Sequence, residues 1–209
     1  NNFYKHLSLS KNNNNRFYLF GLRFFNIIIS IVGLIVLLCL IPILYLGNLL
    51  GNRGPFFYYQ ERVGQNGKKF NIFKLRTMIK NAETKEAVWA VKNDKRITNF
   101  GKFLRNTRLD ELPQFYNILK GEMSFIGPRP ERPEFVKDLE DKIPFYAIRT
   151  VVRPGLTGWA QVNYPYANTI EEQGIKLRYD LYYIKERSAF IDFKILIKTF
   201  TTVLFYRGQ

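Results

Sequence analysis

The longest apolar segment of the chain runs from Ile27 to Leu46 and contains no charged residue. A helix of about 20 residues rises about 30 Å, the thickness of the hydrocarbon core of a membrane. Pro42 lies inside the segment and is expected to bend the helix. Basic residues flank both ends, so charge gives no clear orientation across a bilayer. We therefore predict a hydrophobic helix over about residues 27–50 that re-enters on the same side, with a spanning helix as the alternative.

In the rest of the chain, apolar residues occur in short groups separated by polar residues. Aromatic and apolar clusters on either side of Asn66-Gly67 predict a β-hairpin. Apolar residues spaced to share one face predict several helices after it. These helices are expected at residues 110–120, 134–148 with a break at Pro144, 169–185 and 190–205. The last one carries lysines between its apolar positions, which is typical of a helix lying in a membrane interface, and burial against the domain core is the alternative.

These patterns predict one domain preceded by a polar segment. Residues 1–16 are rich in asparagine and show no apolar period, so we assign residues 1–24 to a polar linker and 25–209 to the domain. The chain begins with Asn rather than Met, as a fragment of a longer protein would. The predicted fold class is α+β. It is a helix-rich monotopic membrane domain with a re-entrant or spanning hydrophobic helix, a small β-hairpin or sheet, and C-terminal amphipathic helices.

Composition narrows the classes of partner. Lys and Arg total 32 against 17 Asp and Glu, a net charge of +15. Such a surplus indicates nucleic acid, acidic lipid or a phosphorylated substrate, and no nucleic-acid-binding motif is present. The single cysteine, Cys39, excludes a disulfide framework or a cysteine-based zinc site. The single histidine, His6, lies in the polar N-terminal segment, which argues against histidine catalysis.

The strongest candidate for chemistry is the acidic pair Asp110-Glu111. Pro113 is tolerated only in the first turn of a helix, so the helix that stops before Gly121 should start near Asp110. Such a helix end favours ionised carboxylates and bound phosphate. Four arginines flank the pair: Arg105, Arg108, Arg129 and Arg132. The cluster indicates a site for a phosphorylated substrate with a metal between acids and phosphate, and an ordinary helix cap is the alternative.

Three other segments carry candidate binding residues. Lys74 and Arg76 alternate along a predicted strand, where they face either a substrate or solvent. The proline-rich loop 127–133 is stiff and holds the planar guanidinium of Arg129 at a fixed angle, which suits phosphate. The Gly/Pro loop 153–163 offers backbone amides to phosphate and polar side chains to a nucleotide base. A purely structural turn is the alternative for this loop.

Three sequence blocks occur in a fixed order. They are FKLRTM at 73–78, a long block that contains LDELPQ at 109–114 and GPRP at 127–130, and RPGLTGWAQVN at 153–163. Together they resemble the bacterial sugar transferase family, the monotopic polyprenyl-phosphate phosphoglycosyl transferases, from about Ile27 to the C-terminus. Residues 162–166 are similar to the longer, exopolysaccharide-type members, which carry extra N-terminal membrane helices. Where the family breaks its re-entrant helix at Ser-Pro, this chain has Ile41-Pro42.

The resemblance implies an enzyme at the cytoplasmic face of the bacterial inner membrane. It would transfer a sugar 1-phosphate from a nucleotide sugar, with UDP expected, to polyprenyl (undecaprenyl) phosphate, as the first membrane step of polysaccharide or glycoconjugate synthesis. Asp110 would be the nucleophile that forms an aspartyl-phosphosugar intermediate, and Glu111 with Asp110 would hold Mg²⁺. The residues implied to bind phosphate or substrate are Arg105, Arg129, Lys74, Arg76, Arg153, Thr157 and Gln161.

Other partners and other functions remain open from the sequence. Membrane lipid is an expected partner, nucleic acid is not, and a homo-oligomer is left open. One alternative function is a metal-dependent nucleotide-sugar glycosyltransferase, against which the sequence offers the absence of an Asp-x-Asp motif. The other is a basic membrane-surface module without catalysis.

Overall fold

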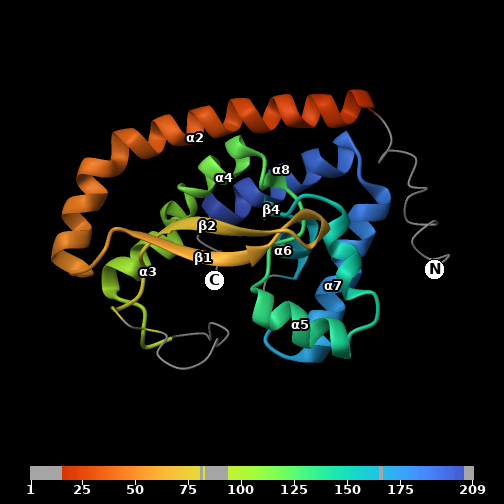
Figure 1. The fold of residues 1–209 in the computed structure, drawn as a ribbon. Coiled ribbons are helices and arrows are strands. Elements are labelled where there is room, and N and C mark those ends of the chain that lie inside the picture. Colours follow the sequence, from red (N-terminus) through yellow and green to blue (C-terminus); the bar gives the residue numbers. More distant parts are fainter. Residues whose placement is uncertain (1–15, 81, 83–93, 165–166, 205–209) are drawn as a thin grey trace.

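A computed structural model describes residues 16–80, 82, 94–164 and 167–204. Residues 1–15 of the predicted linker lie outside these ranges, as do residues 165–166, while residues 16–24 of the linker belong to a helix. The helices are α2 (Arg16–Gly51), α3 (Asn99–Asn106), α4 (Gln114–Lys120), α5 (Pro133–Lys142), α6 (Trp159–Asn163), α7 (Ile170–Glu186) and α8 (Ala189–Leu204) (Figure 1). The strands are β1 (Phe57–Val63), β2 (Lys69–Leu75), β3 (Ser124–Ile126) and β4 (Gly155–Thr157). Short 3₁₀ turns lie at Gln65–Gly67, Leu109–Glu111 and Tyr146–Val151. This is the predicted helix-rich α+β arrangement.

Helix α2 is 36 residues long and lies across the other elements (Figure 1). It starts at Arg16, ahead of the charge-free apolar segment, because Phe17, Phe20 and Phe24 continue the apolar character toward the N-terminus. Figure 1 shows the helix bending toward its C-terminal end. A bend in a long helix needs a local cause, and Pro42 supplies one inside α2.

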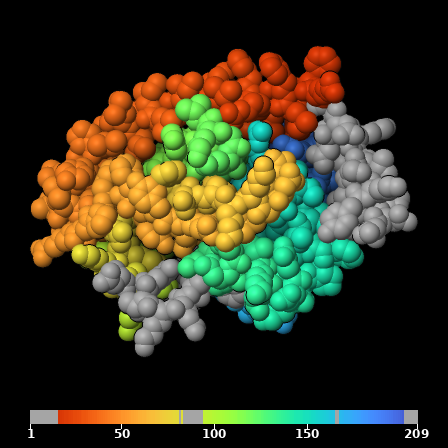
Figure 2. All heavy atoms as spheres, viewed as in Figure 1, coloured from red at the N-terminus to blue at the C-terminus, as the bar shows by residue number. Residues whose placement is uncertain are grey.

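The buried face of α2 combines polar or small residues with the two leucines Leu37 and Leu44, while its exposed face is apolar. Asn26, Ser30 and Gly33 are buried against the domain. The most exposed large apolar residues of the helix are Phe17, Phe20, Leu38, Ile43 and Leu50. Figure 2 shows α2 as a continuous edge of the molecule. A helix of a water-soluble domain keeps its outward face polar, and so large an exposed apolar surface is typical of a membrane contact. By length and composition, α2 is able to cross a membrane.

Hydrogen bonds fix α2 to parts of the domain that lie 95 to 99 residues later in the sequence. Asn26 donates to Ser124 Oγ over 3.0 Å and accepts from the Phe125 amide over 2.9 Å. The guanidinium of Arg23 donates to the carbonyls of Ile118 and Leu119 at the C-terminal end of α4. These bonds place the start of α2 beside β3 and the end of α4.

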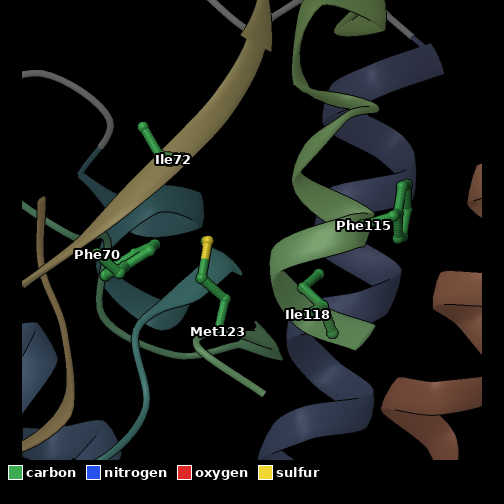
Figure 3. Close-up of a cluster of buried hydrophobic side chains, with 5 residues drawn as sticks. All are labelled: Phe70, Ile72, Phe115, Ile118 and Met123. Carbon is green, nitrogen blue, oxygen red and sulfur yellow. The ribbon is translucent and has the colours of Figure 1, made fainter. Parts of the chain in front are cut away.

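The hairpin prediction is confirmed. Strands β1 and β2 pair antiparallel from Phe57 with Leu75 to Val63 with Lys69. Asn66 and Gly67 both have positive φ, 55° and 74°, as tight hairpin connections require. The buried side of β2 packs on α4 through a cluster of five side chains (Figure 3). They are Phe70, Ile72, Phe115, Ile118 and Met123.

The C-terminal helices match their predicted positions, and α8 has two apolar faces. Ile191 and Ile195 are buried in the core, so the burial alternative holds for that face. The opposite face leaves four large side chains exposed along one stripe: Phe190, Phe193, Ile197 and Phe200. This stripe retains the character of a membrane-interface helix.

Candidate active site

The acidic pair does not open a helix, and this part of the prediction is wrong. Asp110 and Glu111 lie in the 3₁₀ turn Leu109–Glu111, and α4 begins only at Gln114 with Pro113 as its N-cap. Pro113 has no amide hydrogen, so the residues before it form i→i+3 hydrogen bonds of the 3₁₀ type, such as the bond from Leu112 N to Leu109 O. Neither carboxylate caps α4. The acidic pair is therefore surrounded by side-chain cations rather than by the N-terminus of a helix.

Glu111 is held by two cations from distant segments. Its Oε1 accepts from Lys74 Nζ at 3.0 Å and from Arg129 Nη2 at 2.5 Å. Burial alone would raise the pKa of Glu111, but the charges of Arg129, Lys74 and Arg108 outweigh burial and hold that pKa well below its usual range. Glu111 is therefore an anion at neutral pH. The single negative charge of Glu111 faces the two positive charges of Lys74 and Arg129, so positive charge remains in the site.

Asp110 is buried too, but its environment differs. Among the described residues, its Oδ1 has no hydrogen-bond partner. Burial first and the charge of Glu111 second raise the pKa of Asp110 to about 6, against the lowering effect of Lys74, Arg105 and Arg108. Two adjacent carboxylates whose environments push their pKa values apart are typical of a catalytic pair with divided roles. Asp110 is the member with a free oxygen.

Arg105 approaches the pair from α3. Its Nε donates to Thr77 Oγ1 over 2.9 Å, which fixes the side chain at the end of the strand region. Burial lowers the pKa of Arg105, and the carboxylates of Asp110, Asp94 and Glu111 work against that lowering. Lys74, Arg105 and Arg129 thus surround the pair from three separate elements. The charges of Lys74 and Arg105 act on Asp110, and the side chains of Lys74 and Arg129 bind Glu111.

The loop that carries Arg129 leaves β3 and is backed by β4. Strands β3 and β4 pair in parallel, Ser124 with Gly155 and Ile126 with Thr157. Gly127 N donates to Thr157 O over 2.9 Å, and Gly155 N donates to Pro128 O over 2.8 Å. A Cβ on Gly155 would lie 2.1 Å from Gly127 N, so glycine is required here for space. The Gly/Pro loop 153–163 therefore supports the loop of Arg129, which agrees with its structural alternative.

The other predicted binding residues lie away from the pair in their described contacts. Arg76 donates to the Pro55 carbonyl over 3.0 Å. Arg153 has Arg23 and Arg187 as its charged neighbours, and burial followed by their charges lowers its pKa. Thr157 Oγ1 and Thr199 Oγ1 are 2.7 Å apart, and Gln161 donates to Leu156 O over 2.9 Å. Roles of Arg76, Arg153, Thr157 and Gln161 in substrate binding stay predictions.

The pair also limits how a metal could bind. In the described ranges, no group of three or more His, Cys, Asp or Glu side chains forms a metal cluster. A magnesium ion typically uses one or two carboxylates and completes its shell with water and substrate phosphates. The free Oδ1 of Asp110 beside the anionic Glu111 fits that requirement.

Sequence reasoning missed a set of buried charges behind the loop of Arg129. Arg149 and Asp180 form an ion pair of 2.8 Å, and Lys176 lies 3.1 Å from Glu131. Lys176 and Asp180 lie on α7 among the core residues Leu177 and Ile184. Charges at core positions of a helix were the available signal.

Comparisons with known proteins agree with the resemblance noted from the three sequence blocks at 73–78, 109–130 and 153–163. Residues 17–206 match the family described as bacterial sugar transferase. A UDP-N-acetylgalactosamine-undecaprenyl-phosphate N-acetylgalactosaminephosphotransferase of Aeromonas hydrophila is 47% identical over 74% of this chain and 37% of its own length. A UDP-glucose:undecaprenyl-phosphate glucose-1-phosphate transferase of Xanthomonas campestris pv. campestris is 41% identical over 85% of this chain and 37% of its own. The corresponding Escherichia coli K12 protein is 38% identical over 81% of this chain and 38% of its own. The chain thus spans a little over a third of the length of these relatives, and it belongs to the bacterial sugar transferase family.

Proposed function

We propose that this domain transfers a sugar 1-phosphate from a UDP-sugar to undecaprenyl phosphate and releases UMP. The relatives' names supply the two substrates. The observation that carries the proposal is the buried pair in which Glu111 is bound by Lys74 and Arg129 while Asp110 keeps a free oxygen. This is the arrangement that a carboxylate nucleophile beside a phosphate-binding set of cations needs.

In the proposed reaction, a carboxylate oxygen of Asp110 attacks the β-phosphorus of the UDP-sugar. The new bond joins Asp110 to the sugar phosphate, and the bond from that phosphorus to the bridging oxygen breaks, so UMP leaves with the electron pair. A phosphate oxygen of undecaprenyl phosphate then attacks the same phosphorus and releases the Asp110 carboxylate. Lys74, Arg105 and Arg129 stabilise negative charge on the transferring group, because buried cations act strongly where water is excluded.

The same site is proposed to use Mg²⁺. Glu111 and Asp110 would hold the ion, together with oxygens of the diphosphate. When bound, Mg²⁺ supplies positive charge that offsets the charge of the diphosphate. Removing it with a chelator should then lower turnover.

The activity is tested by UMP release. Purified protein in lipid nanodiscs receives a panel of UDP-sugars with and without undecaprenyl phosphate. Release that requires both substrates and yields an undecaprenyl-diphosphate sugar supports the proposal. Sugar transfer that releases UDP would identify a glycosyltransferase instead, and membrane binding without any turnover would favour a non-catalytic module.

Turnover is expected to fall as the pH drops through about 6. Burial and the charge of Glu111 raise the pKa of Asp110 to about 6, and only the ionised carboxylate is a nucleophile. Glu111→Gln removes the neighbouring negative charge, so the residual activity should keep its acid limb at a lower pH. The pH profile of kcat/KM for both proteins checks this, and an unmoved limb in Glu111→Gln would contradict it.

We infer that α2 enters the cytoplasmic face of the inner membrane and returns to it. Support comes from the bend, from Pro42 inside the helix, and from basic residues at both ends. The buried face of α2 contacts the domain from Asn26, which bonds Ser124, to Gly47 and Gly51, which lie against Phe100, and a helix crossing to the far side could not make both contacts. The exposed stripe of α8, residues Phe190 to Phe200, would contact the same membrane surface.

Cysteine labelling in cells tests this topology. Cys39 is first replaced by Ser, and single cysteines are then placed by Arg16→Cys or Gly54→Cys; an added Cβ at Gly54 finds only ordinary contacts, the nearest at 3.7 Å. Both are expected to be protected from an impermeant maleimide in intact cells and labelled after lysis. Labelling of either one from outside would show a spanning helix. A cysteine in a known periplasmic protein serves as the labelling control.

A further inference from the structure

The loop that delivers Arg129 to Glu111 is held by its carbonyl groups. Four consecutive carbonyls, those of residues 128–131, each accept a hydrogen bond. The donors are Gly155 N at 2.8 Å, Arg149 Nη2 at 2.9 Å, Arg62 Nη1 at 3.1 Å and Val63 N at 2.9 Å. Pro128 and Pro130 have no amide hydrogen, so carbonyl bonds are the main way to fix this loop. Two of the four donors are guanidinium groups.

Each of these arginines is in turn fixed by a carboxylate. The Nη2 atom that binds the Arg129 carbonyl also donates to Asp180 Oδ2 over 2.8 Å, and both side chains are almost fully buried, with 6% and 3% exposed. The guanidinium of Arg149 lies over the ring of Tyr146, 5.0 Å from its centre. Arg62 lies 3.7 Å from Glu131, which Lys176 also contacts. Burial would raise the pKa of Glu131, but the charges of Lys176, Arg149 and Arg62 lower it to about 2.

We propose that Arg149 and Asp180 are positioning residues for the transfer reaction. They hold the backbone of Arg129 so that its guanidinium meets Glu111, and Arg62 does the same one residue later. This inference rests on the proposed function for its catalytic meaning. A buried ion pair is costly to desolvate and is weak support for stability alone. Here the Arg149–Asp180 ion pair directs the Arg149 guanidinium at the carbonyl of Arg129, the residue whose side chain binds Glu111.

The central variant is Asp180→Asn, which keeps the shape and removes the charge that orients Arg149. We expect kcat to fall roughly tenfold to a hundredfold, because a misplacement of about 1 Å near the reacting groups costs up to about 100-fold. The decisive readout is a double-mutant cycle with Arg129→Ala. If Asp180 acts through Arg129, Asp180→Asn has almost no further effect on kcat once Arg129 is removed. Independent, multiplied losses would overturn the proposal.

The matched control is Asp192→Asn. Asp192 is also buried, and it accepts hydrogen bonds from Tyr18 and Tyr183 at the junction of α7 and α8. This variant is expected to lower the melting temperature in a similar way, and its effect on kcat should multiply with that of Arg129→Ala. A non-multiplicative result for Asp192→Asn as well would show that the cycle reports general destabilisation and would overturn the assignment.

Hydrogen exchange of the substrate-free protein separates this inference from the proposed function. The amides of Gly155 and Val63, which donate to the carbonyls of Pro128 and Glu131, should exchange at least about tenfold faster in Asp180→Asn, as expected when local opening becomes easier, and at the wild-type rate in Asp192→Asn. Unchanged exchange in Asp180→Asn would overturn the positioning role of Asp180. Faster exchange in a protein without transferase activity would support that Asp180 holds the loop and would refute the proposed function. If Asp180→Asn does not fold, Arg62→Lys tests the same loop through the Pro130 carbonyl.

Discussion

Asp110→Asn is expected to abolish turnover, with a loss on the order of 10³-fold or more, the scale seen when a covalent nucleophile is removed. A neutral amide cannot form the acyl phosphate that the proposed mechanism requires. The side chain keeps its size and its buried position in the turn Leu109–Glu111, so the fold should be preserved. Circular dichroism and UMP release, measured on the same preparation, check both statements.

Mass spectrometry gives the sharper test. Wild-type protein incubated with a UDP-sugar and no lipid acceptor should carry a phosphosugar adduct on Asp110. The adduct should disappear when undecaprenyl phosphate is added, and Asp110→Asn should never show it. The matched control is Asp138→Asn on α5, an exposed aspartate paired with Lys142 at 2.6 Å, which should behave as wild type. An adduct on another residue, or near-normal turnover of Asp110→Asn, would refute the assignment.

Gly155→Ala is expected to remove at least about 99% of the activity, since small displacements of catalytic groups cost about 100-fold. The new Cβ would lie 2.1 Å from Gly127 N and 2.6 Å from Gly127 Cα, and backbone atoms cannot yield as a flexible side chain can. Strands β3 and β4 must therefore separate, and the loop that holds Arg129 moves with them. The melting temperature should fall as well, because overpacking typically costs about 1–3 kcal/mol.

The same substitution at Gly174 is the control. Gly174 lies within α7, and a Cβ there meets nothing within 4 Å. Gly174→Ala should stabilise the protein by about 0.5–1 kcal/mol, because alanine is the better helix former, and should leave UMP release unchanged. Activity of Gly155→Ala above half of the wild-type level would show that the close contact of the two glycines does not position the site.

Local pattern predicted the elements that depend on local chemistry. The hairpin follows from Asn66-Gly67, whose backbone needs positive φ, and α7 follows from its apolar spacing. The start of α4 was misplaced because the rule for proline in a first turn does not separate a 3₁₀ turn from an α-helix. The three-residue strands β3 and β4 were not predicted, since parallel pairing joins segments far apart in the chain.

The site was predicted as a set of residues but not as an arrangement. The acidic pair, Lys74, Arg105 and Arg129 were chosen from motifs, and the structure brings all of them together. Spacing alone could not show that Lys74, 37 residues before Glu111, would contact it. Nor could it find Asp180, since a charge on a helix is usually solvent-exposed and its burial depends on packing from other segments.

The inward polar face of α2 also constrains the order in which the protein can fold during synthesis. Asn26 finds its partners 98 and 99 residues later, at Ser124 and Phe125. At about 5–20 residues per second, the ribosome needs about 5–20 seconds to supply them. In that interval the amide of Asn26 can be satisfied only by water or lipid headgroups, because an unpaired amide in hydrocarbon costs several kcal/mol. If α2 re-enters the membrane as proposed, the nascent helix waits at the membrane surface with this face toward water, already oriented for the domain that later covers it.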